Sequence, residues 1–191
     1  AGISDYYSKG DEIFSLCVDI DNRVLSVHKL ESREKIGEID VGEVEKDKKN
    51  VPLRYGEYLT SASFFGGIDR ILTVQRSQYR AVIWSMSTKK RVGKIRDSGQ
   101  SWLNAEIKKD SKKIALFGMK KVTIVKCSNG KMKIFKEYKS PREDTIGVKF
   151  LPCKHKKRVA ILQVDASCGG DDRKVWTDVV IWDYIENKIV A

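Results

Sequence analysis

Side chains that could perform acid–base or nucleophilic chemistry are few in this chain of 191 residues. The two histidines are His28 and His155, and neither stands beside a serine or cysteine that it could activate. A nucleophilic triad needs a histidine within hydrogen-bond reach of its nucleophile. His28 lies in a strand-like run and is expected to be structural, whereas His155 lies among lysines and is expected to be solvated. The sequence therefore predicts no catalytic residues and a protein that is not an enzyme.

Cofactor and metal motifs are also missing from the sequence. The glycine pairs at 66–67 and 169–170 are expected in turns, and no Lys-Ser/Thr follows them as in a phosphate-binding loop. Cys153, His155 and Cys168 could be forced into a zinc site, but they lack the paired spacing of zinc ligands. Free thiols are the favoured interpretation. We predict no cofactor and no metal.

The chain carries instead a repeated apolar stretch that ends in a tryptophan. It is clearest at 80–86 and again at 178–184, where β-branched residues lead to Trp84 and Trp182. A short polar turn and a second β-rich piece follow each copy. Weaker copies end near Val27 and Val125, so the four markers are spaced 57, 41 and 57 residues apart. Period-two alternation without helical spacing predicts an all-β chain.

The triplets Ile83-Trp84-Ser85 and Ile181-Trp182-Asp183 resemble the end of a WD40 repeat, whose period is about 40–45 residues. The resemblance covers most of the chain and implies a WD40-like β-propeller segment of about four four-stranded blades. The blades are expected at 1–41, 57–97, 101–139 and 144–191, within a single segment 1–191. Inserted loops at 42–56 and 165–178 would account for the two longer spacings. Two β-sandwich strands that each carry a tryptophan are the alternative.

The chain is short for a closed ring, so we expect an incomplete or open ring cut from a longer propeller. Blades with open edges leave strands unpaired, which invites association. A homodimer through these edges is therefore expected as one outcome.

Charge and composition narrow the choice of partners. The chain has 37 Lys and Arg against 26 Asp and Glu, a formal charge of +11, which favours acidic partners. No stretch approaches the roughly 20 apolar residues that a membrane span needs. Scattered cysteines indicate reduced thiols and a cytoplasmic or nuclear location.

If the four strands of each blade are named a to d in chain order, the loops between them divide into two sets. The d–a and b–c loops then emerge on one face, and the a–b and c–d loops on the other. Tyr, Trp and Arg are enriched at binding hot spots, and on the first face we expect a partner-binding set: Arg54, Tyr55, Tyr58, Arg76, Tyr79, Arg80, Trp102, Lys120, Lys121, Arg142, Arg173 and Trp176. The alternative is that Trp102 and the tyrosines belong to the core at strand ends.

The opposite face collects the lysine-rich runs 108–113 and 154–158, which contain no aromatic residue. Such runs are often only solvated turns. The sequence thus predicts a non-catalytic scaffold or sensor segment that binds an acidic protein partner through the first face. Binding of RNA or another single-stranded nucleic acid by the basic and aromatic loops is the alternative.

Overall fold

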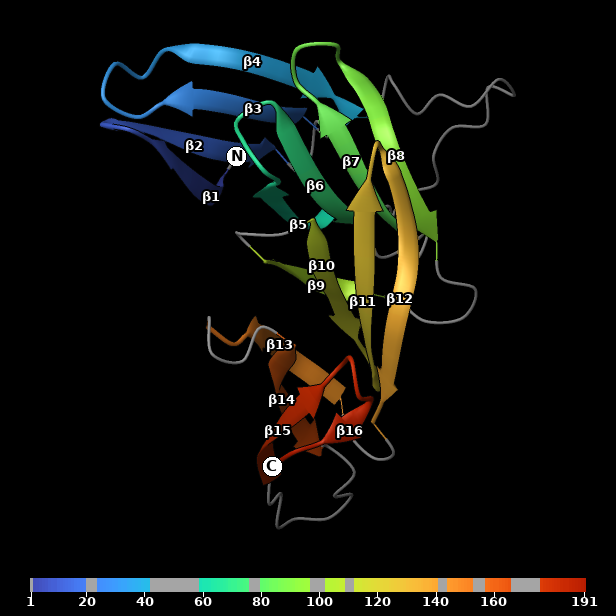
Figure 1. Ribbon diagram of the computed structural model, residues 1–191. Coiled ribbons are helices and arrows are strands. Elements are labelled where there is room, and N and C mark those ends of the chain that lie inside the picture. The colour runs from blue at the N-terminus through green and yellow to red at the C-terminus, as the bar shows by residue number, and fades with distance from the viewer. Residues whose placement is uncertain are drawn as a thin grey trace. The chain divides into compact units, whose positions relative to one another are not determined.

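The computed structural model describes residues 2–19, 24–41, 59–75, 80–96, 102–108, 112–140, 144–152, 157–165 and 176–191. These residues form sixteen β-strands, β1 to β16, arranged as four antiparallel sheets of four strands each (Figure 1). In every sheet the strands follow one another in chain order, so each sheet is a simple meander. The predicted all-β fold of four four-stranded meanders is confirmed.

The chain divides into two compact units, Ala1–Asp97 and Ser98–Ala191. Unit 1 holds two sheets. Sheet 1 consists of β1 (Gly2–Lys9), β2 (Glu12–Asp19), β3 (Val24–Lys29) and β4 (Lys35–Asp40). Sheet 2 consists of β5 (Leu59–Phe64), β6 (Arg70–Gln75), β7 (Arg80–Ser85) and β8 (Lys90–Arg96).

Unit 2 holds the other two sheets. Sheet 3 consists of β9 (Trp102–Ile107), β10 (Lys113–Gly118), β11 (Lys121–Ser128) and β12 (Lys131–Lys139). Sheet 4 consists of β13 (Asp144–Phe150), β14 (Arg158–Asp165), β15 (Trp176–Asp183) and β16 (Lys188–Ile189).

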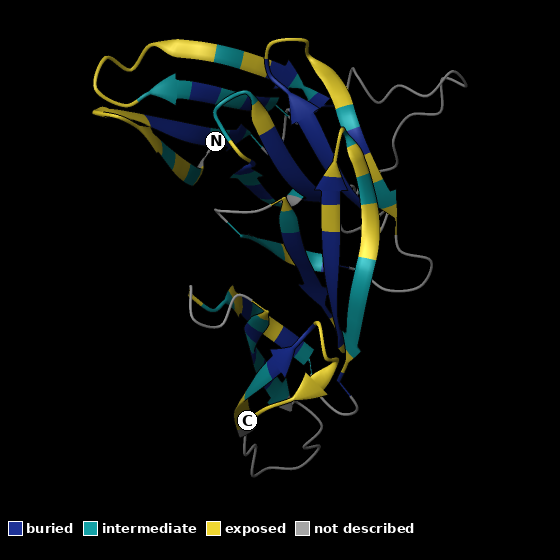
Figure 2. Cartoon of the chain, viewed as in Figure 1, coloured by how far each residue is buried: buried dark blue, intermediate teal, exposed yellow. Residues whose placement is uncertain are grey.

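Burial follows the position of a strand within its sheet. All six residues of β7 are buried, whereas most of β8 is exposed or half-buried, as Figure 2 shows in dark blue against yellow and teal. In β7 the residues on both faces of the strand are buried, and they include Ala81, Ile83 and Trp84. One four-stranded meander cannot hide two apolar faces alone, and stacking against a neighbour is the usual remedy.

Within unit 1, sheets 1 and 2 share one core. Leu16, Leu25 and Val27 of sheet 1 pack in the same cluster as Val82 and Trp84 of sheet 2. A polar contact joins the first strands of the two sheets as well, because Asp5 Oδ2 on β1 accepts a 2.9 Å hydrogen bond from the backbone N–H of Phe64 on β5. Burying apolar side chains of this size stabilises a fold by about 1.5–3 kcal/mol each.

Within unit 2, sheets 3 and 4 share a second core. Phe117 and Ile124 of sheet 3 pack with Trp182 and Tyr184 of sheet 4. The rings of Tyr138 and Trp182 lie 5.7 Å apart between centroids, in a tilted arrangement. Each of the two tryptophan markers therefore fills the space between two sheets.

The same backbone hydrogen bond closes all four sheets and fixes their equivalent positions. A residue within one position of the end of the third strand donates to a carbonyl within one position of the start of the second strand. The four bonds run from Leu30 N to Ile13 O, Met86 N to Asp69 O, Cys127 N to Lys112 O and Tyr184 N to Lys157 O. Counting back two residues gives His28, Trp84, Val125 and Trp182 as equivalent positions.

The predicted marker Val27 is therefore wrong by one residue. A register shift separates Val27 from His28, and the corresponding shifts in sheets 2 and 3 fall just before Trp84 and Val125. Val27 points into the shared core with sheet 2, whereas His28 lies on the other face of sheet 1. An alignment on apolar residues chose Val27 because the true equivalent is a histidine.

The predicted inserted loops cannot be followed through most of their length. Residues 42–56 and 166–175 lie outside the described residues. Residue Asp165 and residues 176–178, which were placed in the second loop, belong to β14 and β15. The single-segment organisation and the blade limits stay predictions. Of the described residues, none belongs to a helix long and apolar enough to cross a membrane.

Candidate interaction surfaces

The meander order gives each sheet two ends that carry different connections. We call the end that carries the d–a and b–c connections the b–c end, and the other the a–b end. Strands β1, β5, β9 and β13 are the a strands, and the remaining strands follow in order.

Eight of the twelve predicted partner-binding residues cannot be located in full. Arg54, Tyr55, Tyr58, Arg76, Tyr79, Arg142 and Arg173 lie outside the described residues. Trp176 opens β15 at the b–c end, but its side chain is outside the described part. Arg80, Trp102, Lys120 and Lys121 are described, and all four lie at the b–c end of their sheets.

Arg80 is a buried cation with a specific partner. Its side chain is only 7% exposed, and its Nε donates a hydrogen bond to Gln75 Oε1 on the neighbouring strand. The two residues are direct cross-strand partners at the end of the β6–β7 hairpin. A buried charge needs such pairing because desolvation is costly.

Lys121 is also buried and paired. Its Nζ lies 2.6 Å from Glu137 Oε1 on β12. Lys120, the residue before it, is exposed and has a φ of 58°, because it occupies the tight turn between β10 and β11. Lys120 is therefore the described member of the predicted set whose side chain faces solvent.

Trp102 is almost fully buried at 1% exposure, and its indole nitrogen has no hydrogen-bond partner in the described structure. Three further buried polar atoms share this condition: Thr123 Oγ1, Thr145 Oγ1 and Gln163 Nε2. All four residues belong to unit 2, and each lies within three residues of a strand terminus at the b–c end. Thr145 and Gln163 are direct cross-strand partners. Buried polar groups without partners are rare and cost about 1–3 kcal/mol each.

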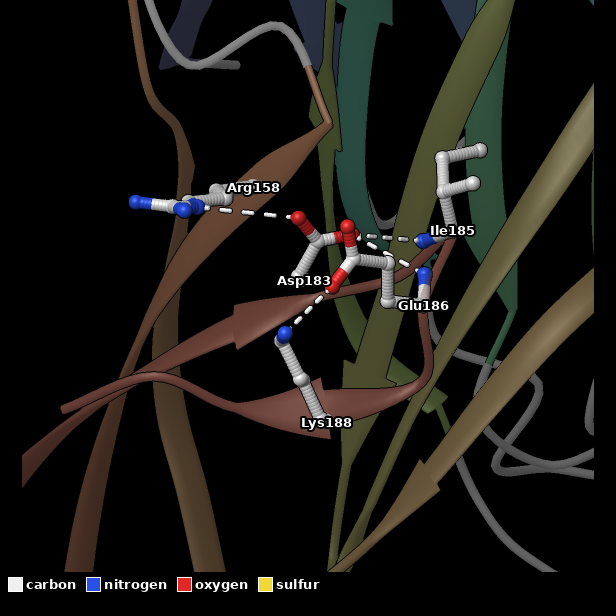
Figure 3. Close-up of polar contacts among 5 residues, drawn as sticks. All are labelled: Arg158, Asp183, Ile185, Glu186 and Lys188. Carbon is white, nitrogen blue, oxygen red and sulfur yellow. Dashed lines mark hydrogen bonds and ion pairs between the residues drawn. The ribbon is translucent and has the colours of Figure 1, made fainter.

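The a–b end satisfies its polar groups internally. In sheet 4, Asp183 Oδ1 accepts hydrogen bonds from the backbone N–H groups of Ile185 and Glu186, at 3.0 and 3.1 Å (Figure 3). Arg158 Nε lies 3.6 Å from the other carboxylate oxygen. The bond from Glu186 and then that from Ile185 lower the pKa of Asp183 below its ordinary value, assisted by Arg158 and opposed by burial. The acidic residue of the Trp-Asp pair thus holds the c–d turn closed.

Asp69 performs a similar task in sheet 2 from a different turn. It accepts a 2.7 Å hydrogen bond from the Ser87 backbone N–H and a further bond from the Ser85 hydroxyl. Burial raises the pKa of Asp69, but the hydrogen bonds from Ser87 and Ser85 outweigh it, so the net shift is downward.

The a–b end of unit 2 also holds aromatic rings, although the lysine-rich runs themselves contain none. Lys126 Nζ lies 3.5 Å from the centroid of the Phe135 ring, and Lys108 Nζ lies 5.7 Å from that of Phe150. Lys113 Nζ lies 5.0 Å from the Tyr184 centroid and donates a 3.3 Å hydrogen bond to its hydroxyl. The rings come from the outer strand of sheet 3 and from sheet 4, so no local sequence run could reveal them.

The hairpin turn at Asn129-Gly130 is the sequence signal that predicts part of this cluster, namely the pairing of two lysines. Lys126 and Lys133 stand at equal distances from that turn, and they are direct cross-strand partners. Asn-Gly between β-rich runs is a strong hairpin signal, so the pairing of these two lysines was within reach of the sequence.

The described residues contain no group of three or more His, Cys, Asp or Glu that could hold a metal ion. Cys153, His155 and Cys168 lie outside the described part. Cys17 and Cys127 are free thiols, and burial raises the pKa of the Cys127 thiol to about 11.

Comparison with known proteins gives likeness of fold only. No protein-family model matches the chain, and no curated protein matches it. Among solved structures, hydrazine synthase of Kuenenia stuttgartiensis is similar over 97% of this chain and 52% of its own, with 13% identity and a TM-score of 0.68. The WD40 repeats of RRP9 and the structure of U3-55K each match 98% of this chain and 50% of their own, with 12% identity and a TM-score of 0.65.

The fold is therefore similar to that of solved WD40-repeat structures. The chain spans about half the length of the solved structures that it matches. At 12–13% identity the likeness carries neither the chemistry of the first neighbour nor the partners of the other two.

Proposed function

We propose that this chain is a non-catalytic segment of a WD40-like propeller that binds an acidic protein partner through the b–c end of its sheets. The proposal rests on four buried polar atoms that have no hydrogen-bond partner in the described structure. They all lie at that end of unit 2 and belong to Trp102, Thr123, Thr145 and Gln163. Groups that lack a hydrogen-bond partner in the free protein gain one when a partner's polar atoms come within reach.

The contrast between the two ends supports this assignment. At the a–b end, Asp69 and Asp183 supply acceptors to the turn N–H groups of sheets 2 and 4. At the b–c end of unit 2, the orphaned donors and acceptors lie where the chain enters or leaves a strand. These side chains are at most 3% exposed, so a partner reaches them only when the strand ends shift.

Charge favours an acidic partner. The chain has a formal charge of +11, and Lys120 presents an exposed ammonium group beside the buried Lys121 at the b–c end. Complementary charge raises association rates and selects partners more than it raises affinity. A cytoplasmic or nuclear location and pairing of chains through open sheet edges remain predictions beside this proposal.

Charge reversal at one exposed residue tests the proposal. Protein captured from extracts of the producing cells by the wild-type chain is identified, and its affinity is then measured for Lys120→Glu and for the control Lys157→Glu. Lys157 is exposed at the a–b end of sheet 4, so the two variants carry the same charge. We expect Lys120→Glu to weaken binding at least fivefold and Lys157→Glu to leave it unchanged. Equal loss in both variants would count against the b–c end.

The salt dependence of the same interaction separates it from nucleic-acid binding. A protein contact through a packed surface should weaken only slightly between 50 and 200 mM salt, whereas a contact to several phosphates falls by orders of magnitude. A steep log-linear loss of affinity for the captured protein would remove the proposal.

A further inference from the structure

Four lysines form a row across sheet 3, one on each strand or at its end. Lys113 on β10 is the direct partner of Lys126 on β11, which is the direct partner of Lys133 on β12. Lys108 follows β9, and its backbone N–H donates a 3.1 Å hydrogen bond to the Lys113 carbonyl. We call these four residues the lysine row. Neighbouring strands lie about 4.8 Å apart, so the row crosses the sheet in steps of that size.

The lysine row lies on the face of sheet 3 that meets sheet 4. Lys113 shares one face of β10 with Ala115 and Phe117, and Lys126 shares one face of β11 with Val122 and Ile124, because residues two apart in a strand point the same way. All four apolar residues pack in the core shared with sheet 4. The row therefore sits at the a–b margin of the interface between the two sheets. Lys126 and Lys133 are exposed, and Lys108 and Lys113 are half-buried.

Folding alone does not favour such a row. Like charges directly opposite each other on neighbouring strands destabilise a sheet. Of the ion pairs between described residues, none involves Lys113, Lys126 or Lys133. Glu106, on the same face of β9, is already occupied by Lys149 at 2.7 Å. The rings of Phe135, Phe150 and Tyr184 offset part of the repulsion through cation–π contacts, but they supply no negative charge.

We infer that the lysine row binds the phosphates of a single-stranded nucleic acid. Lysine binds phosphate as a point charge. The four lysines form a line of like charges, in which Lys126 and Lys133 are exposed, and such a line complements the successive phosphates of one strand. Neighbouring strands are rotated by about 20°, so the row is twisted. A flexible single strand adapts its backbone to a short row of cations, whereas the phosphates of a duplex are held in fixed helical positions.

The rings beneath the row restrict the mode of binding. Lys126 already covers the face of Phe135 at 3.5 Å, and Tyr184 is fully buried. Stacking of bases on Phe135 and Tyr184 is therefore blocked, and we infer a contact made chiefly through the backbone. Binding should be independent of base sequence and strongly dependent on salt.

The test uses the full chain and fluorescently labelled 20-nucleotide single strands of uridine and of mixed sequence. Anisotropy is followed between 50 and 200 mM salt for the wild type, for the double variant Lys126→Gln/Lys133→Gln, and for the control Lys90→Gln/Lys94→Gln. Lys90 and Lys94 are exposed lysines of β8 in unit 1, so the control loses the same charge. Each lost phosphate contact lowers the log–log salt slope by about 0.7, which is about fivefold in affinity at 0.1 M salt.

We expect the row variant to lose about 1.4 from the slope and the control to keep the wild-type slope. An equal loss of salt slope in both variants would show that only the net charge matters, which would overturn the proposal. Tighter binding of a 20-base-pair duplex than of the single strand, or displacement by polyglutamate at equal charge concentration, would also overturn it.

A second measurement needs no variant. The wild-type chain is acetylated at its lysines with and without uridine 20-mer, and the modified peptides are quantified by mass spectrometry. Protection of Lys113, Lys126 and Lys133, with Lys90 and Lys94 unprotected, is the expected result. Uniform protection, or none at the row, would contradict the proposal even if the row variant fails to fold.

Discussion

The indole nitrogen of Trp84 donates a 2.9 Å hydrogen bond to the Thr73 hydroxyl on the neighbouring strand, and both side chains are completely buried. The Thr73 hydroxyl in turn lies 3.5 Å from the Val82 carbonyl. The tryptophan that fills the space between sheets 1 and 2 is therefore also anchored by a polar contact. Its orientation in the core is fixed by that contact as well as by packing.

Replacing Thr73 with Val should destabilise the chain. The substitution keeps the shape of the side chain but leaves the Trp84 N–H buried without an acceptor, which costs about 1–3 kcal/mol. Thr73→Ser, which keeps the hydroxyl, is the matched control. Urea unfolding followed by circular dichroism measures both. A midpoint for Thr73→Val equal to that of the wild type would mean that the hydrogen bond contributes nothing to stability.

The opposite result is expected at Thr145. Its buried hydroxyl has no partner among the described residues, so Thr145→Val removes an unpaired polar atom and leaves the shape unchanged. The free energy of unfolding should stay the same or rise by up to about 1 kcal/mol. The same unfolding experiment measures it. A loss of stability similar to that of Thr73→Val would show that the Thr145 hydroxyl is already paired.

Stability should fall in acid through Asp183. Its folded-state pKa is lowered, chiefly by the Glu186 N–H, so its contribution is complete above the ordinary aspartate pKa of about 3.9 and is lost as pH falls through the lowered value. Asp183→Asn should cost roughly 1 kcal/mol at pH 7, and the difference from wild type should vanish at the acid end. Asp178→Asn, at an exposed aspartate on the same strand, is the control. A pH-independent difference would rule out the carboxylate charge as the cause.

The two described cysteines should differ in reactivity. Burial raises the pKa of Cys127 to about 11, so about one molecule in a thousand carries its thiolate at pH 8. Cys17 is half-buried. Native-state alkylation with iodoacetamide, read from peptide masses, should label Cys17 and leave Cys127 unmodified until urea is added. Labelling of Cys127 at the rate of Cys17 would show that the β11–β12 hairpin opens readily.

Strand positions were well within reach of the sequence because alternation and turn residues are local signals. The apolar stretches around Trp84 and Trp182 coincide with the strands β7 and β15, and Asn129-Gly130 lies in the turn between β11 and β12. The first repeat was misaligned by one residue, since the residue equivalent to Trp84 is His28. A bulge changes the register without a clear mark in the sequence.

The candidate surfaces were harder to predict, because exposure and pairing depend on neighbouring sheets. Arg80 and Lys121 have the residue types of a binding surface, yet both are buried and paired, with Gln75 and Glu137. The lysine row depends on the registers of four strands, and the rings of Phe150 and Tyr184 reach it from another sheet. Such contacts join residues distant in sequence, which single-sequence patterns do not encode.

The most direct test of the account is photo-cross-linking in the producing cells from one position at each end of unit 2. A benzophenone amino acid replaces exposed Lys120 at the b–c end in one strain and exposed Lys133 in the lysine row in another. The account predicts protein adducts from position 120 and nuclease-sensitive adducts from position 133. The same protein adducts from both positions, or nucleic-acid adducts from position 120, would contradict it.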